Sequence, residues 1–166
     1  EFNILKRIAS KKKLRKITIG THSGNLKILH NRYVEKKQII KISLNSKILV
    51  LKIPLIGYFQ TKNLLMAALA ALCCGLKQNK IFNQMDKIKP VAGRLECIAS
   101  LKNNSDIIID FAHTPDALEQ SLIALKNQFK KEIILVFGCG GDRDKNKRSK
   151  MGRIAKKYCQ KIFVTD

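Results

Sequence analysis

The chain has 166 residues, 45% of them hydrophobic, which is enough for one ordinary domain or two small domains with a buried core. Its formal net charge of +21 suggests a nucleic-acid partner, but lysines are scattered over nearly every segment and only 6% of residues are aromatic, unlike surfaces that stack single strands. No apolar run approaches the roughly 18 residues of a membrane span, and the start lacks the zones of a signal peptide, so we expect a cytoplasmic protein without a membrane or nucleic-acid partner.

The first part of the chain is predicted to be rich in β-strands, followed by an apolar helix. Residues 61–76 combine strong helix formers with Thr61 as the expected N-cap and Gly75 near the end. This helix is apolar nearly all round, so we expect it to be buried on several sides. Four segments before it carry β-branched or alternating patterns with polar breaks between them and predict strands: 16–21, 26–34, 38–44 and 46–54.

A domain boundary is predicted near residue 92. A weaker helix is expected over residues 81–88, after which Pro90 and Gly93 interrupt the helical pattern. We therefore expect one domain over residues 1–92 and a second over residues 93–166, closely joined because no linker of low complexity separates them.

The second part predicts the order β-α-β-α-β. A short apolar strand ends at Asp110, and Thr114 and Pro115 are typical of the N-cap and first position of a helix. An apolar run predicts a strand over 132–138, a basic amphipathic helix follows over 147–158, and another strand begins at 161. This α/β alternation predicts a parallel sheet with right-handed crossovers and helices on both faces.

Two strand ends carry residues suited to binding. In open α/β sheets ligands bind beyond the carboxyl ends of the strands. One such end holds Asp110, which could accept hydrogen bonds from ribose hydroxyls or simply lie in a polar loop, and His113, which could be a base, an adenine contact or an ordinary loop histidine. Arg94 follows Gly93 at the junction and could reach a phosphate or pair with Glu96.

The other strand end leads into the glycine-rich loop Gly138 to Arg148. The loop matches neither the Walker A pattern nor a complete GxGxxG, because no GK[ST] follows its glycines and Arg143 occupies the last glycine position. Its glycines and basic residues suit an anionic ligand, and the planar fork of Arg143, between two aspartates, is well built to hold a carboxylate. A tight turn with a solvated basic helix is an equally good interpretation. The five cysteines show no CxxC spacing, which argues against zinc.

Four segments, in order along the chain, resemble the motifs of one family. They are "PLIGYFQTKNLLMAALAAL" (54–72), "PVAGRLE" (90–96), "DFAHTPDALE" (110–119) and "VFGCGGDRDKNKRSKMG" (136–152). Together they resemble the Mur ligases that add meso-diaminopimelate as the third residue of the peptidoglycan stem peptide. The resemblance implies an α/β fold: the end of a central ATPase domain, β-rich plus a helix, followed by the first β-α-β-α-β of a Rossmann-like C-terminal domain.

The resemblance also implies a reaction and its binding residues. The family uses ATP and Mg²⁺ to phosphorylate a carboxylate of UDP-N-acetylmuramoyl-L-alanyl-D-glutamate, and the amine of diaminopimelate attacks the acyl phosphate. Carried onto this chain, Asn63 and His113 lie near the adenine, while Arg94 and Asp110 hold a phosphate or the ribose. Arg143 matches the arginine that binds diaminopimelate. No catalytic residue or main metal ligand is expected among these 166 residues.

Departures from the family pattern leave alternatives open. Gln60 replaces a usual asparagine, Asn146 a glycine and Ser149 a proline. The chain lacks a phosphate loop of the GTxGKT type and stops before an Asp-Asn-Pro-Arg motif, so we expect an internal fragment that is inactive alone. The nearest alternative is a lysine-adding Mur ligase. The alternative from another class is a non-catalytic basic α/β module that binds nucleic acid.

Overall fold

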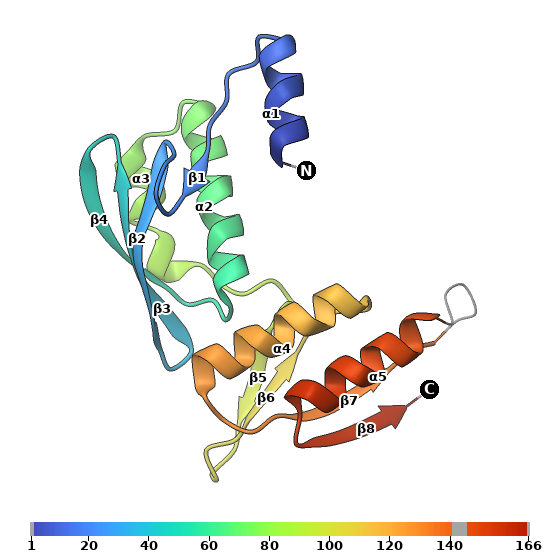
Figure 1. Ribbon diagram of the computed structural model, residues 1–166. Helices are drawn as coiled ribbons and strands as arrows, with labels where there is room; N and C mark the ends of the chain where they lie inside the picture. Colours follow the sequence, from blue (N-terminus) through green and yellow to red (C-terminus); the bar gives the residue numbers. More distant parts are fainter. Residues whose placement is uncertain (1, 141–145, 166) are drawn as a thin grey trace.

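The chain forms a β-rich first part and an α/β second part, as Figure 1 shows for the computed structural model, which describes residues 2–140 and 146–165. The first part holds a sheet in the order β1-β2-β3-β4, in which β1 is parallel to β2 and the other neighbours are antiparallel. The bounds of its strands and helices are α1 Phe2–Lys11, β1 Ile19–Gly20, β2 Leu26–Val34, β3 Lys37–Leu44, β4 Lys47–Ile53, α2 Tyr58–Cys73, α3 Gln78–Phe82 and the 3₁₀ helix η1 Met85–Lys87.

The strand predictions for β2, β3 and β4 are confirmed within one residue at each end. Every second residue of β3 is buried, as the alternating pattern requires. Asn45 and Ser46 both have positive φ (50° and 60°) and form the two-residue turn from β3 to β4, the conformation that matches strand twist in tight hairpins. The expected strand 16–21 is reduced to Ile19–Gly20.

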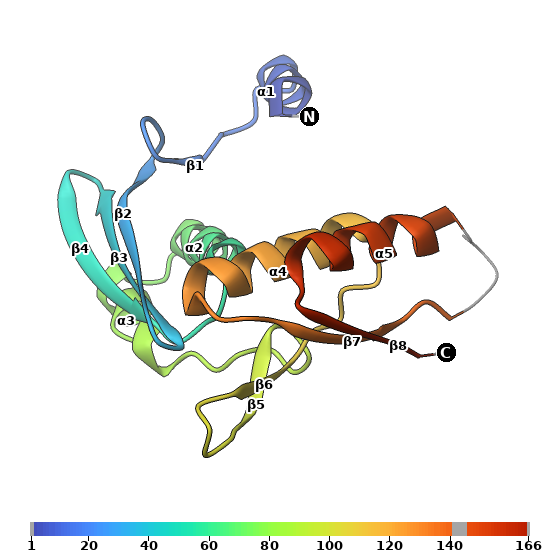
Figure 2. The ribbon, with the colours of Figure 1, turned by 60° about the horizontal axis from the view of Figure 1, so that its bottom comes forward.

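The structure differs from the expectations for the first part in four respects. Residues 2–11 form helix α1, set apart from the sheet in Figures 1 and 2. Helix α2 begins at Tyr58, so Thr61 lies inside it, fully buried, and Gly57 with φ 88° takes the N-cap position. Helix α2 is also not buried on several sides: only one face packs into the core with the sheet, and Met66 is 60% exposed. The expected helix 81–88 is divided into α3 and η1.

The second part contains two separate pairs of strands. Strand β5 (Glu96–Ser100), which the sequence pattern did not reveal, pairs antiparallel with β6 (Asp106–Ile109), and β7 (Ile134–Gly138) pairs parallel with β8 (Lys161–Thr165). In the described residues β6 is not hydrogen-bonded to β7 or β8, so the predicted three-stranded parallel ladder holds only for β7 and β8. Alternation along the chain gives the order of the elements but not which strands become neighbours.

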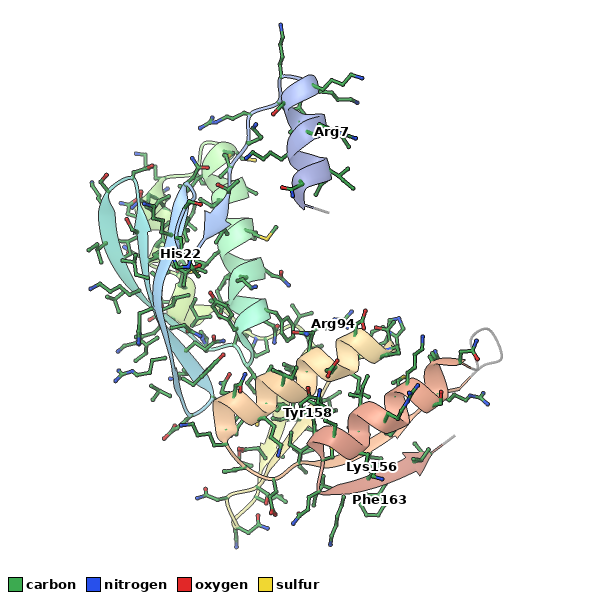
Figure 3. The ribbon with its side chains drawn as sticks, viewed as in Figure 1. Arg7, His22, Arg94, Lys156, Tyr158 and Phe163 are labelled. Carbon is green, nitrogen blue, oxygen red and sulfur yellow. The ribbon has the colours of Figure 1, made fainter. Side chains whose placement is uncertain are left out.

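Helices α4 (Pro115–Phe129) and α5 (Asn146–Tyr158) lie side by side on the same face of β7 and β8 (Figure 2). Helices on both faces of the sheet were expected, whereas α4 and α5 both lie on one face of β7 and β8. Leu118, Leu122 and Met151 form the buried centre between the helices and the strands. Phe163 lies on the sheet and is 57% exposed (Figure 3). None of the helices that the structure describes is long and apolar enough to cross a membrane.

Candidate functional site

A pocket of about 710 Å³ opens where the first and second parts meet, and we call it the α2–α4 pocket. Its walls come from three places: the N-terminal half of α2, the connection from residue 88 to 94, and the segment from the end of β6 into α4. Asn63, Arg94, Asp110 and His113, the four residues expected to bind a nucleotide, all line it. Arg143 lies outside the described residues.

The α2 wall presents one face of a helix. Phe59 and Asn63 are one turn apart, and Ala67 follows one turn later, so side chains at intervals of four line the same wall. Asn63 is exposed, and its amide is therefore accessible to a ligand. An amide carries both donors and an acceptor and can recognise a heterocyclic base by paired hydrogen bonds.

The wall that carries Arg94 is fixed through its backbone. The side-chain amide of Gln60 donates to the carbonyl oxygens of Ile56 (2.8 Å) and Arg94 (2.9 Å). The Arg94 guanidinium then lies over the ring of Phe111, 4.7 Å from the ring centroid, between α2 and α4 in Figure 3. Glu96, the alternative partner considered for Arg94, instead accepts a hydrogen bond from the backbone N–H of Gly93 at 2.8 Å.

Asp110 joins two walls of the pocket. Its Oδ1 accepts from the backbone N–H of Leu95 at 3.1 Å, and its Oδ2 accepts from the hydroxyl of Ser121 on α4 at 2.5 Å. Each carboxylate oxygen has a further lone pair, so these bonds leave Asp110 able to accept from a ligand. The carboxylate therefore has a structural role that its position at a strand end did not reveal.

An exposed aromatic pair forms the rim near α4. The rings of Phe111 and His113 meet edge to face with centroids 5.3 Å apart, and His113 Nδ1 lies 3.1 Å from the carbonyl oxygen of Phe111. The cap of α4 holds this rim, since the Thr114 hydroxyl accepts from the Ala117 N–H at 3.3 Å, as predicted. Phe111 is 62% exposed. It was not predicted as a site residue, because the prediction for this segment relied on the ionisable side chains on either side of it.

The composition of the pocket suits a planar polar ligand with anionic groups. Lys89 and Arg94 supply positive charge, and Asp110 is the single acidic residue among the described residues that line the pocket. Leu55, Leu64 and Ile88 supply apolar surface. The volume falls within the range of about 300–1,000 Å³ common for small-molecule sites. In residues 2–140 and 146–165 no group of three or more His, Cys, Asp or Glu side chains gathers in a way that could hold a metal ion.

A second, smaller hollow of about 370 Å³ lies between α4 and α5 and was not predicted. Its residues include Glu119, whose carboxylate accepts from the Tyr158 hydroxyl (2.8 Å) and the Lys157 ammonium (3.2 Å). These two donors, the tyrosine first, lower the pKa of Glu119 below its ordinary value. The contacts connect the two helices and occupy one of the two acidic groups of this hollow, the other being Asp116.

The sequence and the fold both match known proteins. One family model, the Mur ligase middle domain, matches residues 1–71, and another, the Mur ligase glutamate ligase domain, matches residues 93–166. The UDP-N-acetylmuramoyl-L-alanyl-D-glutamate–2,6-diaminopimelate ligase of Rickettsia rickettsii is 41% identical over 152 residues, which cover 90% of this chain and 31% of the relative. The chain thus spans about a third of the length of the curated relatives that it matches.

Solved structures give the same result. A UDP-N-acetylmuramoyl-L-alanyl-D-glutamate–2,6-diaminopimelate ligase superposes with a TM-score of 0.67 and 27% identity over 98% of this chain and 34% of the other. A MurF ligase from Thermotoga maritima in complex with ADP gives a TM-score of 0.71 at 16% identity, over 96% of this chain and 41% of the other, and so shows the fold alone. The middle-domain model matches the first part of this α/β structure and the glutamate ligase model matches the second part, in the order that the motifs predicted. The chain belongs to the Mur ligase family.

Proposed function

We propose that this chain is the nucleotide-binding junction of an ATP-dependent ligase that adds meso-diaminopimelate to UDP-N-acetylmuramoyl-L-alanyl-D-glutamate. The observation that carries the proposal is the convergence of Asn63, Arg94, Asp110 and His113 on one pocket from segments that are far apart in the sequence. The names of the relatives, together with the family, supply the substrates.

In the proposed site the adenosine part of ATP occupies the α2–α4 pocket. Asn63 offers hydrogen bonds to the base, and the exposed Phe111 and His113 rings offer a surface for it. Asp110 keeps lone pairs for ribose hydroxyls, and Arg94 supplies positive charge for a phosphate. The bound ADP of the MurF relative supports the choice of nucleotide.

The reaction proposed for the whole protein is amide formation through an acyl phosphate. A carboxylate of the UDP-sugar dipeptide takes the terminal phosphoryl group and ADP leaves. The amine of diaminopimelate then attacks the carbonyl carbon, phosphate leaves and the amine loses a proton. Mg²⁺ would neutralise charge on the phosphates. We infer that its main ligands lie elsewhere in the protein, since no group of three or more His, Cys, Asp or Glu side chains gathers among the described residues.

We further propose that residues 1–92 belong to the central domain and residues 93–166 to the C-terminal domain. Arg143, in the glycine-rich loop, would hold a carboxylate of diaminopimelate. The relatives from Rickettsia and Agrobacterium are named as diaminopimelate ligases, which favours diaminopimelate over lysine.

The nucleotide assignment is tested by calorimetric titration of the protein expressed from its whole gene with ADP and with the non-hydrolysable ATP analogue AMP-PNP. Asn63→Ala should weaken binding about fivefold, because a lost hydrogen bond costs about 1 kcal/mol and 1.4 kcal/mol is tenfold. Asn127→Ala is the matched control, since Asn127 is exposed on α4 and does not line the pocket. An affinity of Asn63→Ala equal to that of the wild-type protein and of Asn127→Ala would refute the assignment.

The reaction is tested on the protein expressed from its whole gene. Given UDP-N-acetylmuramoyl-L-alanyl-D-glutamate, ATP and Mg²⁺, it should form the tripeptide product with meso-diaminopimelate, detected by mass spectrometry, and release one ADP per product. L-Lysine in the same assay should give little product. Equal product with lysine would overturn the choice of amino acid without affecting the nucleotide assignment.

A further inference from the structure

The tip of the β2–β3 hairpin reaches across and contacts the second part of the chain. The side-chain N–H of Gln128, at the end of α4, donates to the backbone carbonyl of Glu35 at 3.0 Å. Lys36, the next residue, forms an ion pair with Asp106 on β6 at 2.8 Å and also contacts Ser100 on β5. Figure 1 shows the hairpin tip beside the C-terminal end of α4. We call Glu35, Lys36, Ser100, Asp106 and Gln128 the hairpin latch.

The same Gln128 side chain also holds the residue that precedes α2. Its Oε1 accepts from the backbone N–H of Gly57 at 2.9 Å, and the Gly57 carbonyl accepts from Gln38 on β3 at 3.1 Å. Gln38 is fully buried and Gln128 is 7% exposed. If one of these hydrogen bonds is lost, water therefore has little access to the groups that are left without a partner. One buried amide thus connects the hairpin tip, the start of α2 and the end of α4.

Gln128 makes these contacts from the C-terminal end of α4, whereas the first turns of α4 line the α2–α4 pocket. Ala117 and Ser121 face the pocket near the start of α4, whereas Gln128 is at its end. The helix rises about 1.5 Å per residue, so its two ends are about 20 Å apart and a small rotation at Gln128 becomes a displacement of ångströms at the pocket. The other wall is α2, which starts at the Gly57 that Gln128 holds.

We propose that Gln128, supported by Lys36, is a positioning residue that sets the separation between the α2 and α4 walls of the pocket. It touches no ligand and acts through Gly57 and the hairpin tip. The identity of the pocket ligand as a nucleotide rests on the proposed function. The effect of Gln128 on the separation of the two walls does not depend on it.

The test compares Gln128→Leu with Asn127→Leu, which removes an amide from the neighbouring exposed position of the same helix. Spin labels are attached to ketone-bearing residues introduced at position 62 on α2 and position 116 at the start of α4, so that none of the five cysteines is labelled. Pulsed electron paramagnetic resonance then measures the distance between the two labels, which reports the separation of the walls. Gln128→Leu should broaden or shift the distance distribution and weaken ADP binding at least fivefold among folded molecules. Asn127→Leu should change neither.

A purely stabilising role would lower the free energy of unfolding but leave the distances and the ADP affinity of the folded protein unchanged, and that result would overturn the proposal. If wild-type protein binds no nucleotide, the proposed function fails, and the distance distribution alone still decides the positioning role. If Gln128→Leu does not fold, Lys36→Met is measured in its place. The control is then Lys37→Met, because Lys37 is the adjacent exposed lysine. Lys36→Met should broaden the same distribution; distances identical to those of Lys37→Met would reject the proposal.

Discussion

The side chain of Gln60 holds the backbone of Arg94 at 2.9 Å, although 34 residues separate the two in the sequence. The same amide nitrogen donates to the carbonyl of Ile56, which lies just before α2 begins. The first turn of α2 is thereby joined to the connection that carries the pocket arginine. Where the family motif has asparagine, this longer side chain makes a link between two walls of the pocket.

Gln60→Leu should lower the free energy of unfolding by about 1–2 kcal/mol, because the partly buried carbonyl of Ile56 and the exposed carbonyl of Arg94 both lose their donor. It should also weaken ADP binding, since the Arg94 backbone is released. Urea denaturation measures the first effect and calorimetry the second. Gln84→Leu, at an exposed position without these contacts, should change neither. Equal stability of the two variants would show that the Gln60 bonds contribute nothing net.

Gly57→Ala should be far more damaging than Gly75→Ala. Both glycines have nearly the same φ, 88° and 89°, so the conformational penalty of a side chain is shared. A Cβ at position 57 would lie 3.1 Å from both Leu95 Cδ1 and Phe59 Cε1, whereas one at position 75 would meet nothing within 4 Å. We expect about 1–3 kcal/mol more destabilisation at position 57 in thermal or urea unfolding. Equal losses would mean that the junction core relaxes around the added methyl group.

Local patterns predicted those elements whose signals lie within a few residues. Thr114 and Pro115 mark the start of α4, and alternation in β3 identifies its buried face. Helix α1 was missed although Ile4, Leu5 and Ile8 recur at helical spacing, because the β-rich segments that follow dominated the interpretation.

The site was predictable only as a set of residues. Motif resemblance named Asn63, Arg94, Asp110 and His113 as residues of one nucleotide site, but it did not show the walls of the pocket, because three separate segments of the chain supply these residues. The partners of Asp110 are a backbone N–H and a serine that no pattern marks. Long-range contacts of this kind depend on how helices and strands pack, which periodicity does not contain.

Asp110→Ala should destabilise the chain by about 1–3 kcal/mol, because the Leu95 N–H and the Ser121 hydroxyl both lose their acceptor. Asp110→Asn keeps an acceptor for Leu95 and should retain most of the stability. If Asp110 also binds ribose hydroxyls, Asp110→Asn should still weaken ADP binding several-fold in calorimetry. Wild-type affinity in Asp110→Asn would restrict this residue to its structural role.

Arg143→Ala, in the protein expressed from its whole gene, should raise the apparent KM for diaminopimelate at least tenfold and that for ATP much less. The reason is the loss of a paired, charge-assisted contact to a carboxylate, which is worth more than a neutral hydrogen bond. Steady-state assays with each substrate varied in turn measure both constants. Arg153→Ala, on the exposed side of α5, is the control. Equal increases for the two substrates would contradict a specific role in amino-acid binding.

The ion pair of the hairpin latch makes stability depend on pH in acid. The Lys36 ammonium, and after it the Ser100 hydroxyl, hold the pKa of Asp106 below its ordinary value despite partial burial. Because the folded pKa lies below the unfolded one, near 3.9, this contribution is complete above about pH 5 and is lost as pH falls through the folded value. The pair is partly exposed, so we expect less than about 1 kcal/mol. In urea unfolding, the free energy of unfolding of the wild type should exceed that of Asp106→Asn by a constant amount from pH 5 to 7. This difference should vanish towards pH 2. A difference that stays the same at every pH would show that the charge of Asp106 does not stabilise the latch.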